Sequence, residues 1–273
     1  MYLIPKKDQW KRWSLPSKLT AIGAYLAIVP VALSVLSVAG NAAYDYVDNH
    51  YSVVEKQLSE EVFRKHTGKG LQDSGLHIEV SYPEITSIFD NPAFEQANTE
   101  IMESIISNLK PNLIDLLRKY SISLQNNRVL SITFESYSYY QGAFNGDGSY
   151  GSINIDLKND TFIEFFDVFD VRKQPVKEVK VILKSHIEDG CIMKDKWNDD
   201  RYIPRFSLTD KGVLFLFSEY EATIGACGHS TVEVPYRELG MYIRKDGPIG
   251  HEFKASANWD GREHKKNSVG IYY

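Results

Sequence analysis

A stretch of 26 residues without a charged side chain, from Leu19 to Tyr44, constrains this chain more than any other feature. A helix needs roughly 20 predominantly apolar residues to cross a bilayer, so the stretch is long enough to span one. Pro30 lies in its middle and would kink the helix, a defect that membrane helices tolerate. We therefore predict one transmembrane helix over residues 19–44.

The charges that flank this stretch predict its orientation. Five Lys and Arg residues precede it, whereas Asp45 and Asp48 follow it. Positively charged flanks stay in the cytoplasm, so residues 1–18 are predicted to be a basic cytoplasmic N-terminus. The chain is then a single-pass protein of the inner (cytoplasmic) membrane, with its C-terminal part outside the cytoplasm.

Two alternatives to the anchor stay open. Ser37-Val38-Ala39 resembles the small-x-small site at which a signal peptide is cleaved, although the apolar stretch is longer than a usual signal core. Cleavage would export the C-terminal part as well. The other alternative is a buried helix of a cytoplasmic protein, in which case the asymmetry of the flanking charges is a coincidence.

The charge is distributed unevenly along the chain. Five basic residues and one acidic residue give residues 1–44 a formal charge of +4. The whole chain carries −5, so residues 45–273 carry −9. A negative body repels nucleic-acid phosphates and favours a cationic partner. We therefore predict no nucleic-acid partner.

Residues 45–75 are polar, with a weak helical period. Val47, Val54, Leu58 and Val62 follow one another at spacings of seven and four, and glycines follow at 68 and 70. This pattern predicts a stalk helix and a hinge over residues 45–75. The extracytoplasmic domain is then predicted to occupy residues 76–273.

Within residues 76–273, strand and helix patterns come in blocks. We expect strands over 76–82 (closed by Pro83), 130–134, 153–157, 213–217 and 231–236. We expect helices over 92–109, from Pro111 onward, over 175–187 and over 237–243. The strands at 130–134 and 153–157 flank a glycine-rich turn and could form a hairpin. This order indicates an α+β fold with a mainly antiparallel sheet and packed helices, besides the transmembrane helix.

Cys191 and Cys227 are the only cysteines of the chain. An exported setting permits a disulfide between them, and two separate buried thiols are the alternative. Cys227-Gly228-His229 is at most half of a metal site, because no second Cys or His pair stands at a zinc-like spacing. We predict neither a metal nor a cofactor.

Tyr137, Tyr139 and Tyr140 stand at the end of a predicted strand, beside the glycine-rich turn that contains Asp147. Tyrosine clusters are favoured where proteins bind glycans or other proteins, so these four residues are the candidate binding surface. Cross-strand packing of the rings within the sheet is the alternative. No catalytic motif is present, so we predict no catalytic residues and do not expect an enzyme.

Two stretches resemble known extracytoplasmic domains. Residues 80–85, Val-Ser-Tyr-Pro-Glu-Ile, and residues 96–101, Gln-Ala-Asn-Thr-Glu-Ile, resemble the opening of domain of unknown function 4163. Residues 217–239, which include Gly225-Ala-Cys-Gly-His229 and Val234-Pro-Tyr236, are similar to the C-terminal signature of domain of unknown function 3298. The resemblance implies an α+β fold and an envelope location, as in lysozyme-sensing anti-sigma factors and some peptidoglycan deacetylases.

Many members of that family have Gly-Gly-Ala-His before the middle strand, whereas this chain has Gln141-Gly142-Ala143-Phe144, so that histidine's role does not carry over. From the acidic exported domain and the resemblance we predict a binding or sensing module of the bacterial envelope. Its expected ligand is a cationic protein such as lysozyme, or a cell-wall glycan. The alternatives are a peptidoglycan-directed hydrolase and an envelope structural or assembly protein.

Overall fold

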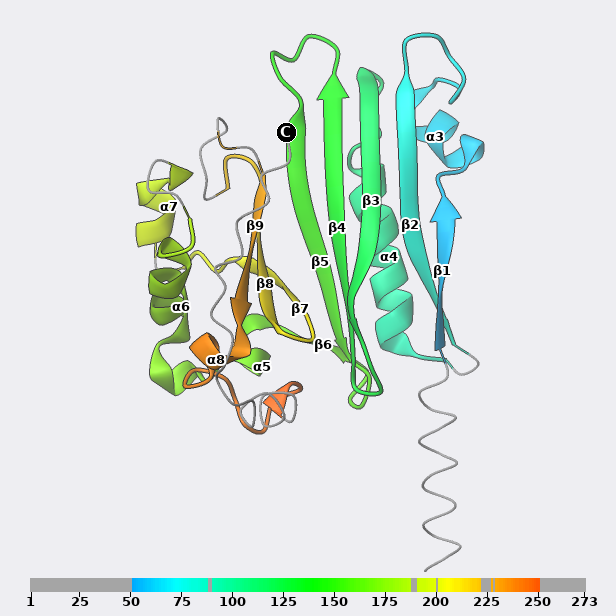
Figure 1. Cartoon of the computed structure of the whole chain (residues 1–273). Helices are drawn as coiled ribbons and strands as arrows, with labels where there is room; N and C mark the ends of the chain where they lie inside the picture. The colour runs from blue at the N-terminus through cyan, green and yellow to red at the C-terminus, as the bar shows by residue number, and fades with distance from the viewer. Residues whose placement is uncertain are drawn as a thin grey trace, which may run out of the picture. The chain divides into compact units, whose positions relative to one another are not determined.

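The computed structural model describes residues 51–87, 90–187, 191–199, 201–221, 227 and 229–250. They form an α+β fold with two sheets, one of six strands and one of three (Figure 1). All strand pairs are antiparallel except β2 with β3, so the predicted fold class, α+β with a mainly antiparallel sheet, is confirmed.

The larger sheet is a meander with one helical crossover, in the order β1-β2-β3-β4-β5-β6. Its strands are β1 (Tyr51–Gln57), β2 (His77–Ser87), β3 (Leu113–Gln125), β4 (Val129–Tyr140), β5 (Asp147–Asp156) and β6 (Thr161–Phe162). Between β1 and β2 lies the short helix α3 (Glu60–Thr67), and between β2 and β3 lies α4 (Pro92–Ile106). Parallel neighbours need such a crossover, which is why a helix separates β2 from β3.

Helix α4 begins where the sequence predicts. The side chain of Asn91 accepts a hydrogen bond from the N–H of Phe94, and Pro92 occupies the first turn. Its buried face carries Ala97, Ile101 and Ile105 and packs against β2 and the neighbouring strands (Figure 1). The apolar period of four therefore predicted the correct buried face.

The smaller sheet, in the order β7-β8-β9, has its own helices. The strands are β7 (Arg205–Leu208), β8 (Gly212–Phe217) and β9 (Ser230–Pro235). The helices are α5 (Phe165–Val168), a 3-10 turn (Val171–Lys173), α6 (Pro175–Lys184), α7 (Lys194–Asn198) and α8 (Tyr236–Leu239). Their apolar side chains form a second core, with Val179, Leu183, Phe215 and Phe217 fully buried.

Strand β7 packs against one face of β4 and β5, opposite the face that α4 covers. Four buried polar residues meet there, and we call them the seam cluster: Ser131, Thr133, Asn154 and Ser207. Asn154 Nδ2 donates to the carbonyl of Phe206 at 2.9 Å, and Ser131 Oγ donates to Asn154 Oδ1 at 2.6 Å. Thr133 Oγ1 donates to Ser207 Oγ at 2.6 Å. The two sheets are thus joined by side-chain hydrogen bonds as well as by apolar contacts.

The predicted stalk helix over 45–75 is wrong over Tyr51–Gln57, which forms β1 and pairs antiparallel with Ser81–Ser87 of β2. The helical spacing of Val54, Leu58 and Val62 crosses a strand, a turn and the start of α3, so it was coincidental. Gly68 ends α3 with a φ of 73°, a conformation that glycine adopts without strain. The folded unit therefore begins before residue 76, at Tyr51.

Two further expectations are corrected. The helix expected from Pro111 onward is strand β3, in which Leu116, Arg118 and Leu124 are buried. Arg118 occupies an inward position of β3, so it interrupts the alternation of apolar and polar residues by which a strand is predicted. Pro83 does not close β2, which continues to Ser87, because this part of β2 pairs only with β1 and tolerates a missing N–H.

The hairpin β4-β5, helix α6 and strands β8 and β9 are confirmed, although Gly148 and Gly151 belong to β5 and not to the turn. The predicted transmembrane segment, residues 19–44, lies outside the described residues. In the ranges that the structure describes, no helix is long and apolar enough to span a membrane.

Candidate functional site

The outer edge of β5 is only partly covered by a neighbouring strand. Strand β6 pairs with Ile155 and Asp156 alone. Farther along this edge, the N–H of Tyr150 donates to Ser218 Oγ at 3.0 Å and its carbonyl accepts from Arg205 at 2.6 Å. The carbonyl of Asn154 accepts from the N–H of Ile163. Because alternate residues direct their backbone groups to one edge, Ser152 presents its N–H and C=O there too, between two occupied positions.

Two open cavities follow this edge, with volumes of about 410 and 350 Å³. Glu100, Ser152, Ile153 and Arg205 line both cavities, so the two adjoin each other along this edge. We call the combined depression the β5 groove. Its walls come from α4, from β5 and from the segment that leads into β7, so it joins parts of the chain that are distant in sequence.

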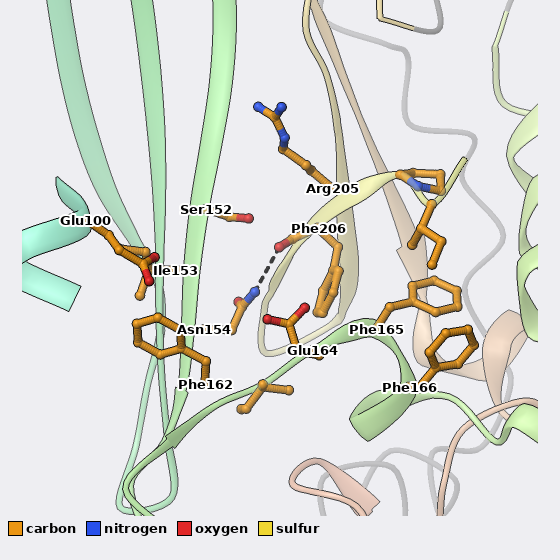
Figure 2. Close-up of a pocket in the computed structure, with 13 residues that line it drawn as sticks. Glu100, Ser152, Ile153, Asn154, Phe162, Glu164, Phe165, Phe166, Arg205 and Phe206 are labelled. Atoms are coloured by element: carbon orange, nitrogen blue, oxygen red, sulfur yellow. Dashed lines mark hydrogen bonds between the residues drawn. The ribbon is translucent and has the colours of Figure 1, made fainter. Parts of the chain in front are cut away.

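The larger cavity has an aromatic wall and a polar wall. Phe162, Phe165 and Phe166 lie on it, and Phe166 remains exposed at the surface. Glu100 and Glu164 are exposed carboxylates that line the same cavity. Figure 2 shows these side chains together with Ser152 and Asn154. The dashed line marks the hydrogen bond from Asn154 to the carbonyl of Phe206.

The smaller cavity is rich in hydroxyl and amide groups. Its polar lining comprises Ser104, Ser107, Asn108, Ser136, Ser149, Tyr150 and Ser152, with the carboxylate Glu100 and the two cations Arg118 and Arg205. It exists because α4 packs mainly on β2 and leaves the same face of β4 and β5 open beyond it. The cross-strand pairs Arg118 with Ser136 and Ser136 with Ser149 place these three side chains next to one another on that face.

Arg118 is the most unusual residue of the groove, because it is a cation with only 6% of its surface exposed. Its Nη2 donates to Ser104 Oγ at 2.8 Å, and its guanidinium carbon lies 4.8 Å from the centroid of the Phe134 ring. Its Nε is buried without an acceptor. Burial lowers the pKa of Arg118 to about 10, so the side chain is still charged at neutral pH. Among the described residues, no carboxylate forms an ion pair with it.

Arg205 lies at the rim of the groove and is held in place by two contacts. Its Nη1 donates to the carbonyl of Tyr150, and its Nη2 lies 3.7 Å from Glu221 Oε1. About half of its side chain is exposed, so this cation is accessible to a ligand. The groove therefore has one buried and one exposed cation.

The predicted tyrosine surface is divided between two faces of the larger sheet. Tyr140 lies on the α4 side, where its hydroxyl donates to the carbonyl of Asn108 at 3.0 Å. Tyr137 and Tyr139 alternate to the other face: the Tyr137 ring packs on Gly146, and Tyr139 donates to the carbonyl of Ala143. Asp147 is exposed opposite Ser138. These contacts are made with turn and loop residues and not between rings of neighbouring strands, so the binding surface and the alternative of cross-strand ring packing both stay predictions.

Cys191 and Cys227 form a disulfide, with their Cα atoms 5.8 Å apart. His229 contacts two carboxylates, with Nε2 at 2.9 Å from Glu135 and Nδ1 at 3.9 Å from Glu219. Within the described part of the chain, no group of three or more His, Cys, Asp or Glu side chains could hold a metal ion.

No protein-family model and no curated protein matches the chain. Among solved structures, it is similar to a member of the domain of unknown function 3298 family from Bacteroides fragilis. The identity is 15% and the TM-score 0.48, over 76% of this chain and 97% of the other. A protein of the same family from Pseudomonas aeruginosa has 15% identity and a TM-score of 0.44, over 71% and 94% of the two chains.

These neighbours belong to the family that residues 217–239 resemble, and neither likeness assigns a ligand or an activity. The resemblance to domain of unknown function 4163 stays a prediction.

Sequence reasoning missed every residue of the β5 groove. Arg118 was assigned to a helix, and Glu100 was quoted only in the resemblance of residues 96–101. One signal was present: Arg118 interrupts an alternating pattern in which Leu116 and Tyr120 are its inward neighbours. A charge at an inward strand position is rare enough to mark a candidate site.

Proposed function

We propose that the chain is a membrane-anchored, extracytoplasmic binding module of the bacterial cell envelope, and that its β5 groove binds a cell-wall glycan. The observation that carries the proposal is the groove itself. Cavities of about 410 and 350 Å³ fall within the roughly 300–1,000 Å³ of small-ligand sites. They are small for a globular partner such as lysozyme, which would need a broad interface.

The chemistry of the two cavities fits a sugar chain. The faces of Phe162 and Phe166 offer apolar surface of the kind that sugar rings stack on, while serine hydroxyls and Asn108 offer donors and acceptors for ring substituents. Ser152 adds backbone groups at the point where the cavities meet. A ligand that extends across both cavities would use the aromatic wall and the hydroxyl-rich wall together.

The extracytoplasmic location has two supports. Residues 19–44 have the length and flanking charges of an anchor with its N-terminus inside. The disulfide between Cys191 and Cys227 favours an oxidising compartment, because disulfides are rare in the cytoplasm. Alkaline phosphatase fused after Tyr273 should be active in cells, and a fluorescent protein that matures only in the cytoplasm should remain dark. The opposite pattern would contradict this location.

The groove is tested by calorimetric titration of the full chain, in a nonionic detergent, with the disaccharide of N-acetylglucosamine and N-acetylmuramic acid. Saturable binding should be lost in Ser152→Trp, which fills the point shared by both cavities. The matched control is Ser121→Trp, at an exposed position of β3 outside the groove, and it should bind as the wild type does.

Two other outcomes would redirect the proposal. Salt-sensitive binding of lysozyme that Ser152→Trp leaves unchanged would place recognition on the acidic surface instead of the groove. Conversion of a peptidoglycan fragment during incubation would favour the alternative of a peptidoglycan-directed hydrolase. In that case, Glu100 and Glu164 are the carboxylates to replace, because both line the larger cavity.

A further inference from the structure

We infer that the smaller cavity of the β5 groove is an oxyanion site, in which Arg118 binds a carboxylate carried by the ligand. The inference deepens the proposed function and depends on it for the identity of the ligand. The chemistry of the site is independent of the proposed function, because it follows from the contacts of Arg118.

The first argument is the unused hydrogen-bonding capacity of a buried cation. A guanidinium has five N–H donors, arranged in a planar fork that matches the two oxygens of a carboxylate. In this structure Nη2 donates to Ser104 Oγ, and Nε has no acceptor although it is fully enclosed. A buried donor without a partner is costly, and a buried charge without a counterion is more so. An anion in the cavity would supply the missing counterion.

The second argument is that the protein does not supply the anion from its own described residues. Other described arginines with ion pairs, such as Arg172 with Asp170 and Arg201 with Asp199, are paired with carboxylates two residues away. Arg118 is neighboured instead by hydroxyls: Ser104 on α4 and, through the cross-strand pair, Ser136 on β4. The Ser104 hydroxyl donates its one proton to the carbonyl of Ile101 at 2.7 Å, so it accepts from Arg118 without supplying a negative charge. The Ser136 hydroxyl could donate to a bound oxyanion, whereas a carboxylate at its place would occupy the site.

The third argument is the sign of the local charge. Residues 45–273 carry a formal charge of −9, so a site for a cation would be built easily from acidic side chains. The smaller cavity has two arginines and one carboxylate, Glu100, which accepts a hydrogen bond from Gln96. Arg205 lies 3.7 Å from Glu221, so Arg118 is the arginine of this cavity that has no carboxylate partner among the described residues, and it can attract an anionic group to an acidic protein.

A carboxylate and a phosphate share this chemistry, and both occur on cell-wall polymers. The lactyl group of N-acetylmuramic acid places a carboxylate on a sugar ring, so one ligand could use the aromatic wall and Arg118 together. N,N′-diacetylchitobiose is the matched neutral disaccharide, because it lacks only this lactyl group. Inorganic phosphate and acetate are probes of the anion site that require no glycan.

The test is a thermodynamic cycle measured by calorimetry on the full chain in nonionic detergent, for wild type and Arg118→Met, with both disaccharides. The wild type should bind the acidic disaccharide roughly tenfold or more tightly than the neutral one, as expected for a charge-assisted pair. In Arg118→Met this preference should disappear while the affinity for the neutral disaccharide stays within about twofold. A structural role of Arg118 would instead weaken both ligands equally, so the cycle separates contact from scaffolding.

Two further variants keep the test decisive if Arg118→Met alters the fold. Arg118→Lys keeps the charge but loses the planar fork, and it should retain only part of the preference. Lys119→Met removes a positive charge from the next residue, which is exposed on the other face of β3. This variant should retain the whole preference for the acidic disaccharide. Phosphate or acetate should compete with the acidic disaccharide and not with the neutral one.

The outcomes distinguish this inference from the proposed function. Equal binding of both disaccharides by wild type and Arg118→Met would overturn the oxyanion site and leave the glycan groove in place. Binding of phosphate or acetate that Arg118→Met abolishes, without binding of either disaccharide, would support the oxyanion site and overturn the glycan. No binding of any of the four probes would overturn both.

Discussion

The larger sheet carries buried polar residues on both of its faces, and the two groups differ in how their hydrogen bonds are completed. On the β7 side, the members of the seam cluster donate to and accept from one another and the backbone of β7. On the α4 side, Arg118 has one hydroxyl partner and a buried Nε without an acceptor. The seam's hydrogen bonds are made within the protein, whereas Arg118 keeps a buried donor for which the described residues supply no acceptor.

Structural and functional polar residues can be separated by whether the fold itself satisfies their hydrogen bonds. Buried polar groups that satisfy one another rigidify a fold, and removing one leaves the others without partners. A buried polar group that the fold leaves unsatisfied reduces stability and is retained for another reason. Substitutions on the two faces should therefore change stability in different directions.

The largest effect on stability is expected at the disulfide, which lies on the β7 side of the comparison. It joins residues separated by 36 positions, and the chain-entropy estimate for such a loop is about 3–4 kcal/mol. Replacing Cys191 and Cys227 with serine should lower the free energy of unfolding by this amount in urea titrations. Binding in the β5 groove should persist. A loss below about 1 kcal/mol would show that this side is held mainly by its core.

The seam cluster should give the next largest effect. Asn154→Ala leaves Ser131 Oγ, the carbonyl of Phe206 and the N–H of Leu208 with fewer partners in a buried place. We expect the free energy of unfolding to fall by about 2–3 kcal/mol. The matched control is Asn127→Ala in the exposed turn between β3 and β4, where a change within about 0.5 kcal/mol is expected. Similar losses of unfolding free energy in both variants would show that the seam cluster contributes no more to stability than an exposed asparagine does.

Arg118→Met should change stability little, within about 1 kcal/mol, and in the stabilising direction. Methionine fills much of the same volume against Phe134 and removes a buried charge without a counterion. Chemical unfolding of the full chain without ligand would measure this, with Lys119→Met as the control. A destabilisation as large as that of Asn154→Ala would mean that Arg118 is a structural residue, and it would break the comparison.

The smallest effect concerns acid stability. The hydrogen bond from the Arg172 side chain lowers the pKa of Asp170 to about 2, below its usual value near 4. A carboxylate with a lowered folded-state pKa stabilises the fold above its unfolded pKa, and this contribution disappears as the pH falls through the folded pKa. The wild type should therefore lose stability between about pH 4 and pH 2.

Asp170→Asn should lose less stability over that window, as measured by thermal unfolding at several pH values. Arg172→Gln, which removes the partner, should behave in the same way. An unchanged pH dependence in both variants would show that this ion pair contributes nothing measurable. The pair belongs to the satisfied part of the molecule, so the variants should leave groove binding unaffected.

Much of the fold followed from sequence patterns. The period of four in α4, its cap at Asn91 and the alternation in β4 and β8 predicted those elements because a single apolar face determines each of them. Strand β1 was missed because its residues are largely exposed at the sheet edge and carry little pattern. Its strand conformation depends on pairing with β2, a tertiary contact that no local window contains.

The β5 groove could not be predicted either, because it too depends on tertiary contacts. Its lining comes from α4, β3, β4, β5 and the segment before β7, which only the fold brings together. Arg118 also concealed the strand on which it lies, because a charge at an inward position contradicts the apolar alternation. The residue that matters most to the proposed site was thus the one that misled the secondary-structure prediction.

The most direct test is a crystal structure of the full chain with the disaccharide of N-acetylglucosamine and N-acetylmuramic acid. We expect the sugar rings to lie in the β5 groove, with the lactyl carboxylate within hydrogen-bonding distance of the Arg118 guanidinium. A disaccharide bound elsewhere, or in the groove with its carboxylate directed away from Arg118, would contradict the account.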